Sequence, residues 1–163
     1  MAQHVRAETR DEVTGALISA ATAAGDRVFR SRVINVATAE MPAILVYANE
    51  EIISRPNIRD TYARSVAIVI EGYEAQRDVA DGTAVLLDEQ LDALAVEIER
   101  AVDGWIHPPP GGAPNPSPKI VDGQLTRVGL SLNGQDKEAC FGVGRLTYRI
   151  DYRTPHGDPV VSK

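Results

Sequence analysis

The clearest pattern of hydrophobic and polar positions lies near the C-terminus, between Phe141 and Arg153. From Leu146 onward, apolar and polar residues alternate one by one, and this two-residue period is typical of a β-strand with one buried face and one solvent-exposed face. The expected buried set is Leu146, Tyr148, Ile150 and Tyr152. The expected solvent-facing set is Arg145, Thr147, Arg149, Asp151 and Arg153. We therefore predict that this segment is the last strand of an antiparallel sheet.

Apolar residues at helical spacing predict a helix over residues 6–24. The positions that recur three and four residues apart are Val13, Leu17, Ala20, Ala21 and Ala24. Thr9 and Glu12 have the spacing of a capping box, with a start a few residues earlier as the alternative, and Gly25-Asp26 should end the helix.

A second helix is predicted over residues 83–103, with an apolar stripe formed by Leu87, Leu91, Leu94, Ile98 and Val102. Its other face is acidic, with Asp88, Glu89, Asp92, Glu97, Glu99 and Asp103 against Arg100 alone. These carboxylates alternate with the apolar stripe as on any solvated helix face, so we interpret them as a solvated or partner-facing surface, in preference to a catalytic or metal site.

Three strands are predicted between the helices, at residues 28–34, 41–48 and 60–74. The second is a dense apolar run, which indicates a strand covered on both faces. Residues 52–59 are polar and interrupted by Pro56, which is typical of a loop. Because the links are short, we expect the three strands to form a meander.

A further strand is predicted at residues 120–133, with Val128, Leu130 and Leu132 on one face. The turn at Asn133-Gly134-Gln135-Asp136 should join it to the final strand as a hairpin. The predicted fold class is therefore α+β, with two helices packed on a largely antiparallel, mixed sheet of about five strands.

The length of 163 residues fits a single domain, 1–163, with its core at about 6–154. Residues 107–118 contain six prolines and predict an exposed loop, and residues 155–163 predict a mobile tail. The single cysteine excludes an internal disulfide framework. No apolar run is long enough to span a membrane and no secretory leader is evident, so we expect a cytosolic protein without membrane contact.

The net charge of −6 is unevenly distributed. Residues 1–106 carry 10 basic and 18 acidic side chains, and residues 107–163 carry 7 and 5, which gives −8 and +2. A chain of this kind is a poor candidate for sequence-specific nucleic-acid binding, where basic residues supply most of the affinity.

Residues that commonly act as nucleophiles, general bases or metal ligands are scattered along the chain. His4, His107 and His156 lie in segments expected to be flexible, and Cys140 lies at a turn. The spacings of metal ligands are missing, and Gly142-x-Gly144 lacks the third glycine of a dinucleotide-binding loop. We therefore predict no catalytic residues, no metal and no cofactor, and favour a binding or assembly role over an enzyme.

This succession of elements resembles the tail terminator proteins of long-tailed phages, the minor tail protein U family. The resemblance covers residues 6–154. The segments that carry it are Met41–Tyr47, Arg64–Tyr73, Leu86–Ala93 and Leu146–Tyr152, of which the first and the last are the most specific. The Pro-rich segment and the tail beyond Thr154 depart from the shorter members.

The resemblance implies a structural virion protein that caps the tail tube, stops its polymerisation and forms the surface onto which the head docks. It also implies a hexameric ring that contacts the tail tube protein and a head-completion or connector protein. DNA would pass through the ring without specific binding, which suits the acidic balance of the chain. The implied location is the virion tail, after assembly in the host cytoplasm.

Six residues are candidates for protein interfaces, because arginine and tyrosine are enriched at binding hot spots. Four follow the Pro42 strand: Arg55, Arg59, Tyr62 and Arg64. Arg149 and Arg153 lie on the exposed side of the final strand, and we expect this row to meet the acidic helix of a neighbouring subunit. The alternative is that all six are ordinary surface residues.

Two other functions stay open at this point. One is another head–tail connector or neck protein of the same virion. The other is a small cytosolic enzyme, whose activity would depend on Cys140 or His107.

Overall fold

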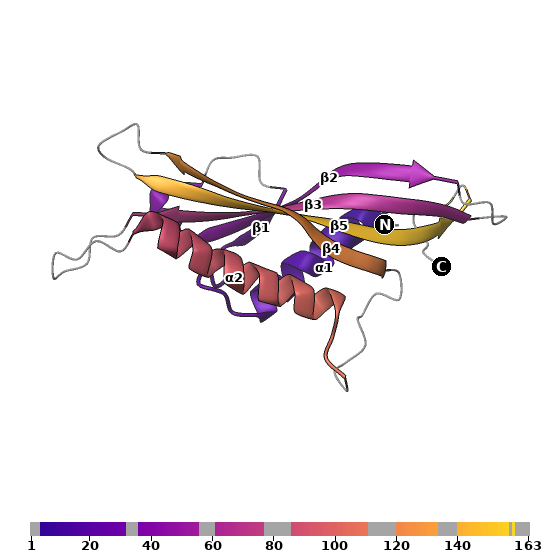
Figure 1. Cartoon of the computed structure of the whole chain (residues 1–163), viewed down its shortest axis with the longest axis horizontal. Coiled ribbons are helices and arrows are strands. Elements are labelled where there is room, and N and C mark those ends of the chain that lie inside the picture. Colours follow the sequence, from indigo (N-terminus) through magenta and orange to yellow (C-terminus); the bar gives the residue numbers. More distant parts are fainter. Residues whose placement is uncertain are drawn as a thin grey trace.

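A computed structural model describes residues 4–31, 36–55, 61–76, 86–110, 120–133, 140–156 and 158. These residues form two α-helices, a short 3-10 helix and five strands, which Figure 1 shows along the chain. The elements in order are α1 (Val5–Ser19), β1 (Val28–Arg30), η1 (Thr38–Glu40), β2 (Ala43–Ser54), β3 (Thr61–Ala75), α2 (Leu87–Ile106), β4 (Ile120–Asn133) and β5 (Phe141–Pro155). The predicted α+β class is confirmed.

The five strands form one mixed sheet in the order β1-β2-β3-β5-β4. The β2–β3, β3–β5 and β4–β5 pairs are antiparallel, so the predicted hairpin of the last two strands is confirmed. The predicted meander is wrong, because β1 pairs with β2 in parallel. The connection that contains η1 brings the chain back to the end of the sheet at which β1 began, and β2 therefore runs in the same direction as β1.

Strand β5 lies inside the sheet, between β3 and β4. It pairs with β3 without a break, from Thr61 opposite Pro155 to Ala75 opposite Phe141. The predicted alternation is confirmed, because all four apolar side chains of its inner face are at most 1% exposed: Leu146, Tyr148, Ile150 and Tyr152. Arg145, Arg149 and Arg153 of the other face are exposed.

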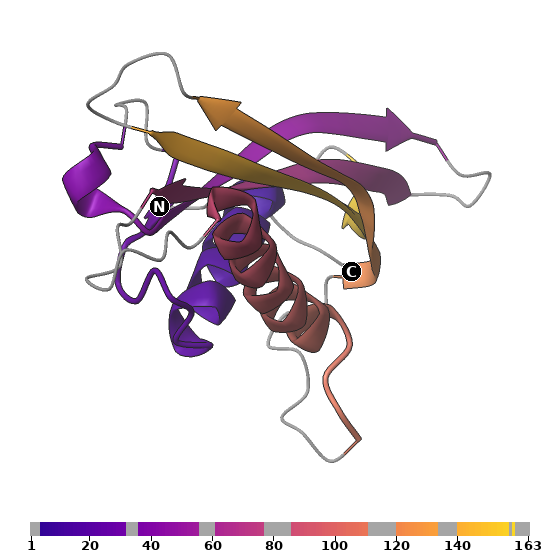
Figure 2. The same ribbon diagram turned by 60° about the vertical axis from the view of Figure 1, so that its left-hand side comes forward.

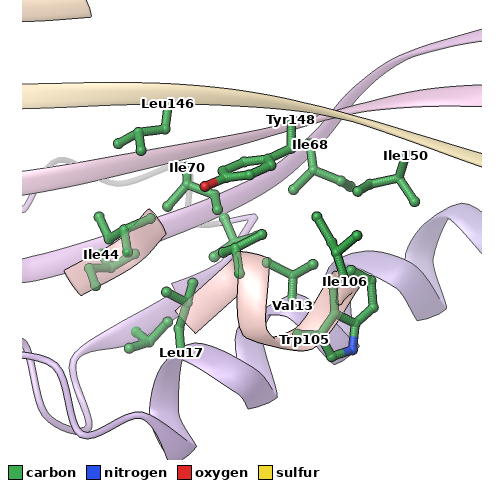
Figure 3. Close-up of a cluster of buried hydrophobic side chains, with 14 of the residues drawn as sticks. Val13, Leu17, Ile44, Ile68, Ile70, Trp105, Ile106, Leu146, Tyr148 and Ile150 are labelled. Atoms are coloured by element: carbon green, nitrogen blue, oxygen red, sulfur yellow. The ribbon is translucent and has the colours of Figure 1, made fainter. Parts of the chain in front are cut away.

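Both long helices cover the same face of the sheet, as the two views in Figures 1 and 2 show. Figure 3 shows Val13 and Leu17 of α1 and Trp105 and Ile106 of α2 beneath the side chains of the strands. All five predicted stripe residues of α2 are buried. Burial of a large aliphatic side chain contributes about 1.5–3 kcal/mol, so this single layer of contacts accounts for much of the stability.

A smaller cluster on the opposite face confirms that the start of β2 is covered on both sides. Ile44 and Val46 face the helices, whereas Ala43 and Leu45 pack with Val36. The partly buried side chains around this second cluster are Phe29, Met41, Tyr47 and Tyr73.

Helix α1 is shorter than predicted. It ends at Ser19, because Ala20 forms the C-cap and Ala21 adopts a left-handed φ of 49°. Ala20 and Ala21 are therefore exposed, whereas Ala24 folds back into the core. The predicted capping box is also wrong: Nδ1 of His4 accepts the N-cap hydrogen bond from the Arg6 amide, and the Thr9 hydroxyl donates to the Val5 carbonyl within the helix.

Strand β2 continues through part of the predicted 52–59 loop, because a bulge between Ala48 and Glu51 lets Ile52 to Ser54 keep pairing with β3. Helix α2 spans Leu87–Ile106, shifted toward the C-terminus from the predicted 83–103. Parts of several predictions lie outside the described residues: the end of the first strand, residues 56–59 of the predicted loop, residue 60, residues 83–85, residues 134–136 of the predicted turn, most of the Pro-rich loop and most of the C-terminal tail.

Candidate interaction surface

The face of the sheet opposite the helices carries polar side chains from four strands, and we call it the open face. On β5 it consists of the odd-numbered residues, including Arg145, Arg149 and Arg153. The strand register places Glu71 of β3 beside Arg145, and Gln124 of β4 beside Arg149. The open face is thus fixed by the same alternation that buries the other side of β5.

Two hollows follow one another along the open face. The larger has a volume of about 770 Å³, and its lining includes Ala67, Val69 and Val143 together with Arg127 and Arg145. The smaller, of about 260 Å³, is lined by Ile52, Ser54, Ala63, Arg64, Ser65, Val121, Asp151, Tyr152 and Arg153. Both hollows combine an apolar floor with charged side chains, a composition that suits a protein partner.

The open face carries four arginines, and two of them have ion-pair partners. The four are Arg127, Arg145, Arg149 and Arg153. Nε of Arg145 lies 3.7 Å from Oε1 of Glu71, and the other carboxylate oxygen of Glu71, Oε2, accepts a hydrogen bond from the Tyr73 hydroxyl at 3.1 Å. Arg149 lies 3.5 Å from Asp151. Within the described part of the chain, no ion pair is found for Arg127 or Arg153, so these two cations can engage a partner without first breaking an internal pair.

The acidic carboxylates of α2 lie on the other side of the molecule. Asp88, Glu89, Asp92 and Asp103 are exposed, with Val96 between them at 44% exposure. Glu97 is already engaged, because Oε2 accepts a 2.7 Å hydrogen bond from the Ala23 amide. This outer face therefore has an apolar centre and an acidic border.

The predicted residues near the end of β2 form a second group, on the helix side of the sheet. The Tyr62 ring stacks on His156 with 4.9 Å between ring centroids, and Nη2 of Arg55 lies 3.1 Å from Nε2 of His156. The structure thus brings Arg55, Tyr62 and Arg64 together and places Arg149 and Arg153 on the opposite face. Arg59 lies outside the described residues.

Arg64 belongs to a buried polar cluster that the sequence did not predict, and we call it the Glu51 cluster. It consists of His4, Glu51, Arg64, Tyr152 and Thr154. The side chains of Glu51 and Arg64 are only 8% and 9% exposed, and their Oε1 and Nη1 atoms are 3.2 Å apart. Nε of Arg64 donates to the Thr154 hydroxyl at 2.8 Å, and the Tyr152 hydroxyl donates to Glu51.

The Glu51 cluster contains residue types that also serve as acids and bases, but its geometry suits a structural role. Burial raises the pKa of Tyr152, and the hydrogen bond to Glu51 raises it further, so the phenol stays a donor. Burial also lowers the pKa of His4, whose Nε2 lies 3.9 Å from Glu51. The polar groups are directed at one another, and they tie β2, β3 and β5 to the start of α1.

The edge strand β4 exposes apolar side chains. Val128, Leu130 and Leu132 share one face, as predicted, and that face is on the helix side. They stay about half exposed, because β4 is the last strand of the sheet and α2 does not cover them fully. An exposed edge strand of 14 residues is a second candidate contact surface.

In the described ranges there is no group of three or more His, Cys, Asp or Glu that could hold a metal ion. Cys140 is an exposed free thiol. No helix among the described residues is long and apolar enough to cross a membrane.

Comparison of the sequence with protein-family models gives no match, and comparison with curated proteins gives none either. Among solved structures, the chain is similar to a chain in the virion of a native gene transfer agent (GTA) particle. The two are 10% identical, with a TM-score of 0.48, over 93% of this chain and 96% of that one. A functional proposal therefore has to rest on the residues of this chain.

Proposed function

We propose that this protein is a structural component of a phage virion that caps the tail tube. In this role it ends tube polymerisation and, as a ring of subunits, forms the surface onto which the head docks. Its partners are further copies of itself, the tail tube protein and a head-completion or connector protein. The sequence resemblance over residues 6–154 suggests this role.

The observation that carries the proposal is the different chemistry of the two sides of the subunit. The open face has hollows and four arginines, and the helix side has the acidic outer face of α2. A subunit that closes a ring through head-to-tail contacts needs two different, complementary surfaces. The apolar edge of β4 supplies a third surface, which suits a contact with the tube end. The role requires no catalytic group.

Negative-stain electron microscopy of the purified protein, alone and mixed with purified tail tubes, tests the proposal. We expect rings one subunit thick with a central hole, rings at one end of the tubes, and no further tube growth when the protein is present. The proposal would be refuted if the protein stays monomeric at high concentration and also does not bind the tail tubes. Binding to filled heads with no binding to tubes would instead indicate a neck protein.

A further inference from the structure

We propose that the two hollows of the open face receive helix α2 of a second copy of this chain. The proposal rests on the proposed function only in assuming that the chain assembles with itself. It names the two surfaces that make the contact, which the resemblance does not.

The receiving surface is long enough for several turns of helix. The larger hollow is lined by Arg145 and Thr147 of β5, the smaller by Asp151 and Arg153, and Arg149 stands between them on the same strand. A strand rises about 3.3 Å per residue, so this row extends over roughly 25 Å. Helix α2, at 1.5 Å per residue over 20 residues, is about 30 Å long.

The charges of the two surfaces are complementary. Arg127, Arg149 and Arg153 are exposed on the open face, where Arg149 pairs with Asp151 and the exposed Glu50 also lines the larger hollow. On α2, Glu89, Asp92 and Asp103 are exposed, and the exposed Arg100 is the one basic residue of the helix. Within the described part of the chain, no ion pair involves the three acidic side chains, so the helix carries uncompensated negative charge. Carboxylates that meet arginines across an interface form strong, directional hydrogen bonds.

The apolar parts also correspond. Val96 and Ala93 are exposed near the middle of the outer face of α2, and the larger hollow offers the partly exposed Ala67 and Val143. An interface with an apolar centre and a charged border has the usual anatomy of a specific protein contact. Small side chains in the floor allow the helix to approach the sheet closely.

The two surfaces lie on opposite sides of one subunit, because α2 covers the face of the sheet that points away from the hollows. A subunit therefore cannot fill its own hollows with its own α2. The contact has to be heterologous, with the helix side of one copy on the open face of the next. Contacts of this type form rings when the rotation closes and filaments when it does not.

Charge reversal in separate chains tests the contact. One variant carries Arg127→Glu and Arg149→Glu on the open face, and the other carries Glu89→Arg and Asp92→Arg on α2. We expect each variant alone to self-associate at least tenfold more weakly than the natural chain in sedimentation velocity over a concentration series. We expect an equimolar mixture to recover association, since each reversed surface then meets a complementary one.

Matched controls change charge elsewhere: Arg6→Glu on α1 and Asp26→Arg in the turn after it, both exposed. They should leave association within about twofold of the natural chain. Unfolding curves of each variant check that it folds. If the first variant does not fold, Arg127→Gln with Arg149→Gln replaces it in the comparison with the natural chain only, since neutral glutamines do not complement the reversed helix in the mixture. Unchanged association of either reversed variant, or a mixture that stays dissociated, overturns the proposal.

The test separates this inference from the proposed function. If the natural chain stays monomeric in solution and both reversed variants cap tail tubes as well as the natural chain does, the inference fails and the function stands. If the natural chain associates, and the mixture is restored, but tail tubes are not bound, the contact stands and the function fails. Association that the reversals do not affect would point to another surface, such as the edge of β4.

Discussion

At the scale of single residues, Glu51 links strand β2 to β3, to β5 and to the start of α1. It lies on β2 and accepts hydrogen bonds from Arg64 of β3 and Tyr152 of β5, while His4 approaches it from the start of α1. The bulge after Ala48 turns Glu51 toward the helix side. Because the pair with Arg64 is buried, removing one partner leaves an uncompensated charge in the interior.

Glu51→Gln should therefore destabilise the protein by about 3 kcal/mol, since Gln keeps an acceptor for Tyr152 but leaves Arg64 without its counter-charge. Urea unfolding followed by circular dichroism measures the change. Glu50→Gln, at the exposed neighbouring position, is the matched control and should change stability by less than about 0.5 kcal/mol. Equal changes in the free energy of unfolding for the two substitutions would mean that the Glu51–Arg64 pair contributes no more to stability than an exposed carboxylate does.

His4 should make stability depend on pH. Burial lowers the pKa of its imidazole below the ordinary value of 6.5, although the nearby Glu51 carboxylate acts in the opposite direction. The folded chain therefore resists protonation more than the unfolded chain, so the His4 contribution is complete above pH 6.5 and is lost as the pH falls below it. Protonation of Nδ1 would also remove the acceptor for the Arg6 amide.

His4→Asn keeps an N-cap acceptor without a titrating group, so its stability should fall less than that of the natural chain between pH 7.5 and pH 5.5. Urea unfolding at the two pH values measures the difference. His4→Ala should cost about 1 kcal/mol at pH 7.5 through loss of the cap. If the natural chain and His4→Asn lose stability in parallel, the pH dependence comes from other groups.

The sequence predicted only part of the residue-level picture. The alternation on β5 placed Arg149 and Arg153 on an exposed face, because a strand without a bulge keeps a strict period of two. The Glu51 cluster could not be found in this way, since the bulge in β2 breaks that period just before Glu51. Arg64 was predicted as an interface residue together with Arg55 and Tyr62, and that role stays untested.

At the scale of elements, helix α2 lies unusually close to the sheet at Gly72. A Cβ atom added there would stand 2.8 Å from Cδ2 of Leu94 and 3.3 Å from Cδ1 of Ile98. Both side chains are almost fully buried, so neither can move aside freely. Gly72 thus sets how closely α2 approaches the central strands.

Gly72→Ala should destabilise the protein by about 1–3 kcal/mol through overpacking. Gly129→Ala is the control, because no atom lies within 4 Å of its added Cβ and alanine reduces the freedom of the unfolded chain. It should be neutral or slightly stabilising in thermal unfolding. A Gly72→Ala variant as stable as the natural chain would show that α2 can shift along the sheet without a loss of stability.

The elements themselves were predictable to different degrees. The stripe of α2 and the alternation of β5 are long and regular, and both are confirmed. The length of α1 was overestimated, because Ala20 and Ala21 fit a helical stripe in sequence although the chain turns there. Strand β2 was underestimated, since Pro56 and the polar residues around it are typical of a loop, yet pairing with β3 holds Ile52 and Ile53 in the sheet although both are exposed.

At the scale of the whole molecule, the α+β class followed from the order of the elements, but the parallel pairing of β1 with β2 did not. A three-residue strand has too little pattern to reveal its direction, and only the connection through η1 decides it. Whether the chain forms a single domain over residues 1–163, with a core at about 6–154, stays a prediction. The arrangement of layers nevertheless explains why the acidic helix and the arginine row face opposite directions.

Salt should therefore weaken self-association while leaving the subunit folded. If arginines of the open face meet carboxylates of α2, raising NaCl from 50 to 500 mM screens these exposed pairs, each of which contributes about 0.2–1 kcal/mol. Three such pairs together contribute about 0.6–3 kcal/mol, which predicts a Kd about threefold to a hundredfold higher, since 1.4 kcal/mol corresponds to a factor of ten. Association through the apolar edge of β4 would instead be unchanged or strengthened. Sedimentation velocity at the two salt concentrations, with unfolding curves of the same samples, distinguishes the two contacts.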